Sequence, residues 1–524
     1  MSKFSHPALY LAKDRGKRSM FKILFSRIGI ISLLLLLQIL FFIGLFTWFT
    51  ELTPIFYPIS LFFSYVMVIY LVNNRMNYSA KITWLIVIMA VPIFGALFYA
   101  YTLSNVGHRK LAKKVNQVIE DTQDKLVQDP AALRLLETLD EGTTNLSHYL
   151  RINGNYPVYN QTATTYYPSG ETKYQALLEA LEAAQDFIFL EYFIIQEGQM
   201  WGSILEILAR KASQGLDVRV LYDGTNAFTK VPFDYDKKIQ ALGIKCKIFA
   251  PITPFLSTHY NYRDHRKIVV IDGKVAFNGG VNLADEYINI NSPFGHWKDA
   301  AIKLEGDAVA SFTLMFLQLW HIDEKDEDMD RFIQKSHPAL LEDGFVIPFA
   351  DEPLDDDKVG KMVYIDILNR ARRYVYIMTP YLILDGEMET AIRFAAKRGV
   401  KVRIIMPGIP DKKIPFALAK SFYVNLLRAG VEIYEYQPGF VHSKVFLSDD
   451  EIGVVGTINL DYRSLYHHFE CATLLYRTSS LVDIHQDFQA TLAACQKISL
   501  SSNQDRPLLQ KLVGWVMRIF ATLM

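Results

Sequence analysis

The chain contains an internal repeat, and this repeat limits its possible folds more than any other feature. Residues 187–224 read as a strand, a helix, a glycine stop and a second strand, and residues 374–408 repeat that order. The glycine stop is Gly215 in the first copy and Gly399 in the second. Strands that alternate with helices are typical of α/β units on a largely parallel sheet. We therefore expect an α/β fold in which two similar halves form a pseudo-dimer within one chain.

Each half also carries one copy of a short motif, H-x-K-x4-D-x6-G-[GT]-x-N, in residues 265–282 and 442–459. The motif residues are His265, Lys267, Asp272, Gly279, Gly280 and Asn282 in the first copy, and His442, Lys444, Asp449, Gly456, Thr457 and Asn459 in the second. One H-x-K-x4-D in a chain of this length is roughly a few-per-cent chance event, so a single copy is a weak signal. Two copies at matching places in a repeat are strong evidence for a functional site.

The spacing within the motif separates its side chains into two groups. In an extended strand, residues i and i+2 face the same way, so His265 and Lys267 project together. The same holds for His442 and Lys444. Asp272 has the opposite parity and begins an Asp-Gly hairpin turn, which indicates a structural part in the site.

The strands that return after each turn offer a place for a ligand. Glycines such as Gly280 allow a ligand to approach the backbone closely. The side chains of Asn282, Thr457 and Asn459 offer neutral hydrogen-bond donors. We expect these four residues to contact the substrate.

Two imidazoles, two ammonium groups and several neutral donors together suit a phosphodiester substrate. The lysines and asparagines can stabilise charge on the phosphate oxygens. One histidine can attack phosphorus while the other protonates the leaving alcohol, because imidazole, with a pKa of about 6.5, serves in either protonation state near neutral pH. Each histidine needs an orienting carboxylate, and the candidates are Asp299 in FGHWKD and Glu470 in HHFE, at comparable distances after the two motifs.

A metal site is the main rival interpretation, because histidines and carboxylates are both present. A lysine beside each histidine repels a metal ion, and the sequence has no His-x3-His or cysteine cluster, so we expect no metal. The sequence also lacks a P-loop, which argues against a nucleotide. Lys+Arg and Asp+Glu both number 55, and this zero net charge argues against a nucleic-acid partner.

The motif residues resemble the paired HKD motifs of the phospholipase D superfamily. Flanking phrases narrow the resemblance to bacterial cardiolipin synthases: NYRDHRKIVVIDGKVAFNGGVNLADEY, FGHWKD, TPYL and GTINLDYRSLYHHFE. The resemblance covers nearly the whole chain. It implies a catalytic set made of His265, Lys267, Asp272, His442, Lys444 and Asp449.

The resemblance also implies a reaction. A phosphatidyl group would pass from one phosphatidylglycerol to another through a phosphatidyl-histidine, giving cardiolipin and glycerol without a cofactor. By resemblance His265 is the nucleophile and His442 the acid and base, although the near-symmetry of the motifs leaves this assignment open. The expected partners are phosphatidylglycerol, as donor and acceptor, and membrane lipids. A membrane phospholipase D, in which water resolves the intermediate, is the closest alternative. A catalytically inactive scaffold is a third, against which the complete motifs in both halves argue.

Three uncharged runs precede the repeat, at residues 28–50, 55–72 and 82–103. A run of about 20 apolar residues can cross a bilayer core of about 30 Å, so we expect N-terminal transmembrane helices and a multi-pass protein of the bacterial cell membrane. Basic residues both precede the first run and follow the third. Because positive residues favour the cytoplasmic side, two or three spans both remain open.

These features divide the chain into five expected parts. They are a membrane anchor (1–103), a juxtamembrane connector (104–155), a first phospholipase-D-like half (156–335), a second half (336–500) and an amphipathic tail (501–524). The apolar face of the tail consists of Leu509, Leu512, Val513, Val516, Phe520 and Leu523. This face could lie at a membrane interface or pack on the domain itself.

Overall fold

The computed structural model describes residues 7–11, 36–37, 40, 43–44, 53–74, 76–90, 95–96, 98–100, 106–251, 262–323, 329–333, 344–355 and 357–523. The chain forms two compact units. The larger unit takes in residues 1–15, 113–251 and 261–515, and so contains both motifs. The smaller unit takes in residues 16–112, 252–260 and 516–524.

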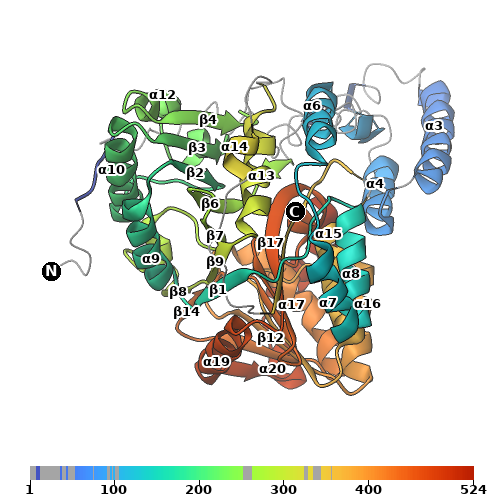
Figure 1. Cartoon of the computed structure of the whole chain (residues 1–524). Coiled ribbons are helices and arrows are strands. Elements are labelled where there is room, and N and C mark those ends of the chain that lie inside the picture. Colours follow the sequence, from blue (N-terminus) through green and yellow to red (C-terminus); the bar gives the residue numbers. More distant parts are fainter. Residues whose placement is uncertain are drawn as a thin grey trace. The chain divides into compact units, whose positions relative to one another are not determined.

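The first half of the larger unit is built on a seven-stranded sheet with the order β1-β9-β7-β6-β2-β3-β4 (Figure 1). The strands are β1 (Thr162–Tyr167), β2 (Phe187–Tyr192), β3 (Asp217–Asp223), β4 (Lys245–Phe249), β6 (Lys267–Ile271), β7 (Val275–Gly279) and β9 (Ala301–Gly306). Only β2, β3 and β4 pair in parallel within this sheet, and the other neighbours are antiparallel. The expectation of a largely parallel sheet is therefore wrong, because the motif strand β6 turns back as a hairpin into β7.

The second half repeats this arrangement strand for strand, in the order β10-β17-β16-β15-β11-β12-β13, and adds β18 at the far edge. The strands are β10 (Phe345–Asp351), β11 (Tyr374–Met378), β12 (Lys401–Pro407), β13 (Glu432–Tyr436), β15 (Val445–Ser448), β16 (Ile452–Gly456), β17 (His468–Tyr476) and β18 (Cys495–Ile498). The second motif strand, β15, thus occupies the place that β6 has in the first sheet. The prediction of two similar α/β halves is confirmed.

Helices cover both faces of the first sheet, and β2 shows how the sequence assigns them. Successive strand residues point to opposite faces. Ile188 and Leu190 are buried in the core beneath α9 (Gly170–Ala183) and α10 (Gln199–Ser213). Phe189 points to the other face, where it stacks on Phe316 of α13 (Val309–Trp320), with ring centroids 4.6 Å apart. Figure 1 shows α9 and α10 on one side of this sheet and α13 on the other. Each fully buried aliphatic or phenyl side chain contributes about 1.5–3 kcal/mol.

The remaining helices of the larger unit lie in the second half, the connector and the loops. The second half has α15 (Val359–Arg370), α16 (Gly386–Lys397), α17 (Lys413–Arg428), α18 (Tyr462–Tyr466), α19 (Ser480–Ala493) and α20 (Leu500–Gln504). The first half also has α11 (Asn226–Thr229), α12 (Tyr235–Gln240), α14 (Asp330–Ile333) and the 3-10 helix η2 (Asp285–Ile288). The connector forms α6 (Val106–Thr122), α7 (Pro130–Leu139) and α8 (Glu141–Ile152).

The connector is anchored to the second half by polar contacts. Asp140 caps α8 by accepting a hydrogen bond from the amide of Thr143. The same carboxylate lies 3.1 Å from the Arg370 guanidinium of α15. A capping side chain typically contributes about 1 kcal/mol to the stability of its helix. The same carboxylate therefore both stabilises α8 and holds it against α15.

Two short pairs of strands join the halves, and they determine where the site lies. β5 (Arg263–Asp264), which leads into the first motif, pairs in parallel with β17 of the second half. β14 (Gly439–Val441), which leads into the second motif, pairs in parallel with β8 (His296–Lys298) of the first half. The chain therefore enters each motif along a strand of the other half.

The smaller unit contains α3 (Thr53–Asn73) and α4 (Tyr78–Ala90). Leu71, Trp84 and Ile88 are buried together in its core. Within the described ranges, no helix combines the length and the hydropathy that a membrane crossing requires. The first uncharged run, residues 28–50, lies mostly outside the described residues.

The tail forms α21 (Leu508–Ile519). Gly514 is the residue that this helix buries, and a β-carbon at that position would lie 2.7 Å from the backbone oxygen of Ala417 in α17. Leu508, Leu509, Leu512 and Trp515 are exposed. Within the apolar face predicted from the sequence, Leu509, Leu512 and Val516 are exposed, so these three side chains do not pack on the domain.

Candidate active site

The two motif histidines lie where the halves meet, because backbone hydrogen bonds continue the two inter-half strand pairs. The amide of His265 donates to the carbonyl oxygen of Phe469 at 2.9 Å. The amide of His442 donates to the carbonyl oxygen of Lys298 at 2.7 Å. Each bond places a motif histidine beside the next residue of the other half's strand, and that residue is a carboxylate in both cases.

Each histidine pairs with the carboxylate that follows the other motif. Nδ1 of His265 lies 2.9 Å from Oε2 of Glu470, and Nδ1 of His442 lies 2.7 Å from Oδ2 of Asp299. Both carboxylates are fully buried. A carboxylate that accepts the Nδ1 proton holds the ring in the tautomer whose Nε2 lone pair is available to a substrate. Glu470 and Asp299 were recognised in the sequence as candidates, and the crosswise pairing is new.

The motif lysines are buried close to these pairs. Nζ of Lys267 donates to the carbonyl oxygen of His265, and Nζ of Lys444 donates to that of His442. Nζ of Lys444 also lies 2.9 Å from Nδ1 of His442. Because Nδ1 of His442 donates its proton in the hydrogen bond to Asp299, it cannot also accept one from Lys444. The Lys444 ammonium therefore acts on the ring as a neighbouring positive charge. Lys267 lies over the ring of Phe193, with Nζ 5.5 Å from the centroid.

Burial keeps both imidazoles neutral in the free site. It lowers the pKa of His442 to about 4, and the adjacent Lys444 acts in the same direction. Burial also holds the pKa of His265 well below its usual value, against the attraction of Glu470. Burial likewise lowers the pKa of Lys444 to about 7 and that of Lys267 to about 8. All four groups would gain protons more readily if an anion were bound beside them.

The two carboxylates remain ionised. Burial favours the protonated form of Glu470, but His265 and His468 together hold the pKa of this carboxyl below its ordinary value. Burial acts in the same way on Asp299, where His442 and then Lys444 lower the pKa. Two carboxylates and two ammonium groups nearly cancel, so a phosphodiester anion that enters the site would favour protonation of one histidine. This is the arrangement that a general acid requires.

Gly280 is required by the site's own atoms. A β-carbon at this position would lie 2.1 Å from Oδ1 of Asp299 and 3.0 Å from the carbonyl oxygen of His442. The carboxylate could not remain in place, and the contact with the carbonyl oxygen would be tight. The absence of a side chain at Gly280 therefore makes room for the Asp299–His442 pair, and the close approach of a ligand to this glycine stays a prediction.

Asn282 and Thr457 hold neighbouring groups in position. Oδ1 of Asn282 accepts from the amide of Ile194 at 3.1 Å, and its Nδ2 donates to the Tyr287 hydroxyl at 2.7 Å. The Thr457 hydroxyl donates to Oε2 of Glu470. Asn459 differs, because its buried Oδ1 has no hydrogen-bond partner in the described part of the chain. A direct contact with substrate stays a prediction, and it suits Asn459 best.

The motif aspartates lie at the opposite end of their strands from the histidines. Asp272 follows Lys267 by five residues, about 16 Å along a strand. Its carboxylate accepts from the amides of Gln185, Asp186 and Phe187, between 2.8 and 3.0 Å. Asp449 does the same for the amides of residues 372–374. Both aspartates therefore anchor the strand beside the motif. Although they belong to the predicted catalytic set, their carboxylates do not contact the histidines.

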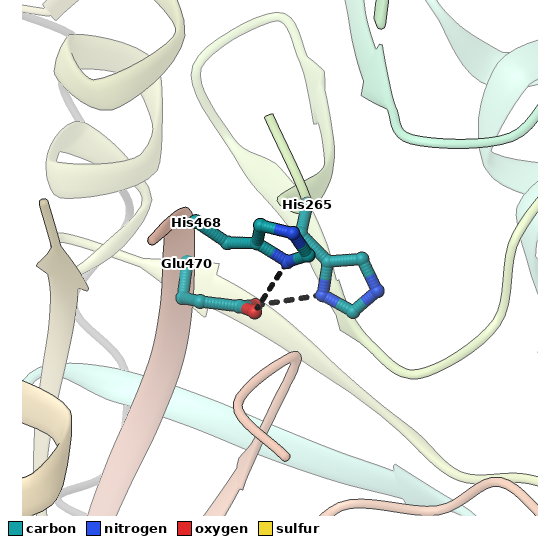
Figure 2. Close-up of side chains that lie close together, drawn as sticks. All are labelled: His265, His468 and Glu470. Carbon is teal, nitrogen blue, oxygen red and sulfur yellow. Dashed lines mark hydrogen bonds and ion pairs between the residues drawn. The ribbon is translucent and has the colours of Figure 1, made fainter. Parts of the chain in front are cut away.

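One further histidine, not singled out in the sequence, reaches the site. Among the described residues, His265, His468 and Glu470 form a group whose potential ligand atoms lie within 4.8 Å of one another, and Figure 2 shows both rings directed at the carboxylate. In this group His265 and Glu470 are already hydrogen-bonded to each other, and Lys267 acts on Glu470 as a positive neighbour. The group is therefore better suited to orient an imidazole than to hold a metal ion.

A family model described as "Cardiolipin synthase, PLD-like domain" matches residues 177–320 and 364–492, which contain both motifs. Relatives named cardiolipin synthase are similar to this chain in sequence over most of their length. One from Alkalihalophilus pseudofirmus is 32% identical over 91% of this chain and 95% of its own length, and one from Geobacillus thermodenitrificans is 35% identical over 85% and 89%. An uncharacterized protein of Streptococcus mutans is 54% identical over 87% of this chain and 99% of its own length.

A solved structure shares the fold. The phosphatidylserine synthase of Haemophilus influenzae aligns with a TM-score of 0.55 at 16% identity, over 73% of this chain and 99% of that chain. This likeness supports the architecture of two paired halves. Taken with the family match and the relatives, it means that the chain belongs to the cardiolipin synthase family with PLD-like domains.

Proposed function

We propose that this protein is a cardiolipin synthase, a phosphatidyltransferase that moves a phosphatidyl group from one phosphatidylglycerol to another. The observation that carries the proposal is the crosswise pairing of His265 with Glu470 and of His442 with Asp299. It leaves Nε2 of each ring as the nitrogen available to a substrate, and the lysine buried beside each histidine can help to hold a phosphate anion. The reaction that we assign to this site is inferred from the family to which the chain belongs.

In the first step, Nε2 of His265 attacks phosphorus and forms a P–N bond. The P–O bond to the glycerol headgroup breaks, and His442 gives its Nε2 proton to the departing oxygen. Lys267 and Lys444 lie beside the histidines and would offset charge on the phosphate oxygens. Glu470 offsets the positive charge that His265 gains, which is a stabilisation that grows toward the transition state.

In the second step, a headgroup hydroxyl of another phosphatidylglycerol attacks phosphorus. His442 takes the proton from that hydroxyl, the P–N bond breaks, and His265 returns to its neutral form. One phosphodiester bond is exchanged for another, so the reaction requires neither a nucleotide nor a redox partner. The choice of His265 as the nucleophile follows the resemblance to the family.

The same proposal places the protein in the bacterial cell membrane, as a multi-pass protein with two or three spans in residues 1–103. Side chains of α3 support this, because Ile59, Phe62 and Ile69 are 58%, 70% and 64% exposed. The exposed leucines of α21 would meet lipid at the other end of the chain. The rest of the chain then consists of the connector (104–155), two catalytic halves (156–335 and 336–500) and the tail (501–524).

The test supplies the full-length protein, in detergent–lipid micelles, with phosphatidylglycerol alone and a metal chelator. Lipids and released glycerol are measured by mass spectrometry. Cardiolipin and glycerol in equal amounts are expected. Phosphatidic acid as the main product would replace the proposal with a phospholipase D. No product from a folded sample would refute phosphatidylglycerol as the donor.

A further inference from the structure

The two halves of the site differ at one position beside the paired histidines. Trp297 precedes Asp299 by two residues, and His468 precedes Glu470 by two residues. The Trp297 ring lies 5.4 Å from the His442 ring at an angle of 44°, and the His468 ring lies 5.4 Å from the His265 ring at 39°. The two neighbours occupy equivalent places, but one is an apolar indole and the other is a titratable imidazole.

His468 also approaches the carboxylate that orients His265. Nδ1 of His468 lies 3.7 Å from Oε1 of Glu470, while Oε2 of the same carboxylate accepts from His265 (Figure 2). A separation of 3.7 Å is too long for a hydrogen bond. Both of these atoms, Nδ1 of His468 and Oε1 of Glu470, are buried and have no hydrogen-bond partner among the described residues. The carboxylate thus lies between two imidazoles, with one oxygen directed at each.

We propose that His468 is a positioning residue that tunes His265 through the shared carboxylate of Glu470, so that the two histidines of the motifs are chemically inequivalent. This inference rests on the proposed function. A shift of less than about 1 Å would bring His468 into hydrogen-bonding range of Oε1. Such a bond would draw negative charge away from Oε2 and make His265 less basic. A less basic imidazole stays neutral for attack and departs more readily from phosphorus in the second step.

The surroundings of His468 are consistent with this part. His468 acts electrostatically on Glu470 of β17, on His265, which follows β5, and on Asp461, which caps α18, and its partner in the strand pairing is the cation Arg263. Phe193 supplies an apolar contact, with ring centroids 6.2 Å apart. His468 is one of the groups that lower the pKa of His265, after burial and Lys267. At the equivalent place Trp297 carries no titratable group, and an indole ring 5.4 Å from His442 favours a cationic ring there, as a general acid requires.

The test compares His468→Asn and His468→Trp with the wild type in the pH dependence of cardiolipin formation. The acidic limb of kcat/KM reports the group that must be neutral in the free enzyme. In both variants we expect this limb to move up by about half a pH unit or more, because a group that disfavours the imidazolium is lost. The tryptophan variant retains an aromatic ring, so it separates tuning from packing. His467→Asn removes the adjacent histidine, whose ring faces Tyr262, and should leave the limb in place.

A second readout keeps this inference separate from the proposed function. The ring proton of His265 can be titrated by NMR in the folded full-length protein and assigned with His265→Ala, whether or not any lipid is converted. An upward pKa shift of His265 in the His468 variants supports the tuning. An unchanged titration in both, or an equal shift in His467→Asn, overturns it. A wild type that converts no phosphatidylglycerol would count against the proposed function alone.

Discussion

Replacing Glu470 with glutamine removes the negative charge beside His265 while nearly preserving the shape of the side chain. Oε2 of Glu470 accepts from Nδ1 of His265 at 2.9 Å and from the Thr457 hydroxyl. In the proposed reaction His265 becomes positive as it bonds phosphorus, so the carboxylate stabilises the transition state more than the ground state. Glu470 does not need to touch the lipid for this effect. The substitution should therefore lower kcat and leave KM nearly unchanged.

The size of the effect follows from the geometry of the pair. A hydrogen bond to a charged group contributes about 1.5–3 kcal/mol. Since about 1.36 kcal/mol corresponds to a factor of ten in rate, losing this stabilisation slows transfer roughly 10- to 150-fold. The loss would be larger if the new amide turned its NH2 group toward Nδ1, because the ring would then adopt the wrong tautomer. In the serine-protease triad that change costs about 10⁴-fold.

The assay is the initial rate of cardiolipin formation over a range of phosphatidylglycerol concentrations, with thermal unfolding to confirm the fold. Glu435→Gln is the matched control, because Glu435 is a buried carboxylate of β13 that binds Lys420 and Tyr423. It should keep the wild-type kcat. A loss of kcat below about threefold in folded Glu470→Gln, or a change confined to KM, would refute the orienting role of Glu470.

Three further perturbations test other parts of the site. Gly280→Ala would place a β-carbon 2.1 Å from Oδ1 of Asp299, so we expect a fall in kcat of about 100-fold, measured by initial rates, as that carboxylate is displaced. Asp272→Asn should lower the free energy of unfolding by about 1–3 kcal/mol, because three backbone amides lose a charged acceptor. The folded variant should keep its kcat. Thermal unfolding measures the first effect and initial rates the second. The ammonium groups of Lys444 and Lys267, with pKa values of about 7 and about 8, are present below those values and lost above them, so kcat/KM should fall as pH rises through this range. A bound phosphate anion raises these pKa values, so the falling limb of kcat should lie at higher pH than that of kcat/KM.

Each of these perturbations has a contrary outcome. Gly386→Ala serves as the glycine control, because a β-carbon there meets no atom within 4 Å. Wild-type kcat in Gly280→Ala would mean that the Asp299 pair is dispensable. An Asp272→Asn variant with normal stability and lost activity would make Asp272 a catalytic group. Coincident limbs of kcat and kcat/KM would mean that neither lysine senses the substrate's charge.

Much of the site was predictable because its residues recur. The duplication placed 265–282 and 442–459 at matching positions, and the strand period predicted that each lysine lies on the same side as its histidine. The pairing of the carboxylates was not predictable in this way. It depends on contacts of two or three residues between β5 and β17 and between β14 and β8, and it joins residues 205 and 143 positions apart in the chain. No local pattern encodes such contacts.

Other differences have equally local causes. The repeat predicted parallel strands, but the motif hairpin adds antiparallel ones, since the three residues between β6 and β7 are too few for a crossover to a parallel strand. Asp272 and Gly273 at that turn both have positive φ, as the tight hairpin requires. The hydrogen bond from Asn282 to Tyr287 could not be predicted, because Tyr287 lies in a short 3-10 helix that no sequence pattern indicates. His468 was overlooked because a single histidine on a strand carries no signal until its neighbours are known.

The central claim is that one histidine forms a covalent bond to phosphorus while the other only moves protons. A phosphatidyl ester of p-nitrophenol tests it most directly, because this leaving group needs no proton. His442→Ala should release about one equivalent of p-nitrophenolate in a burst and then stall, with the phosphatidyl group on the peptide that contains His265 by mass spectrometry. His265→Ala should show no burst. A burst in His265→Ala with the adduct on His442 would reverse the assignment, and the absence of a burst in both folded variants would contradict the covalent mechanism.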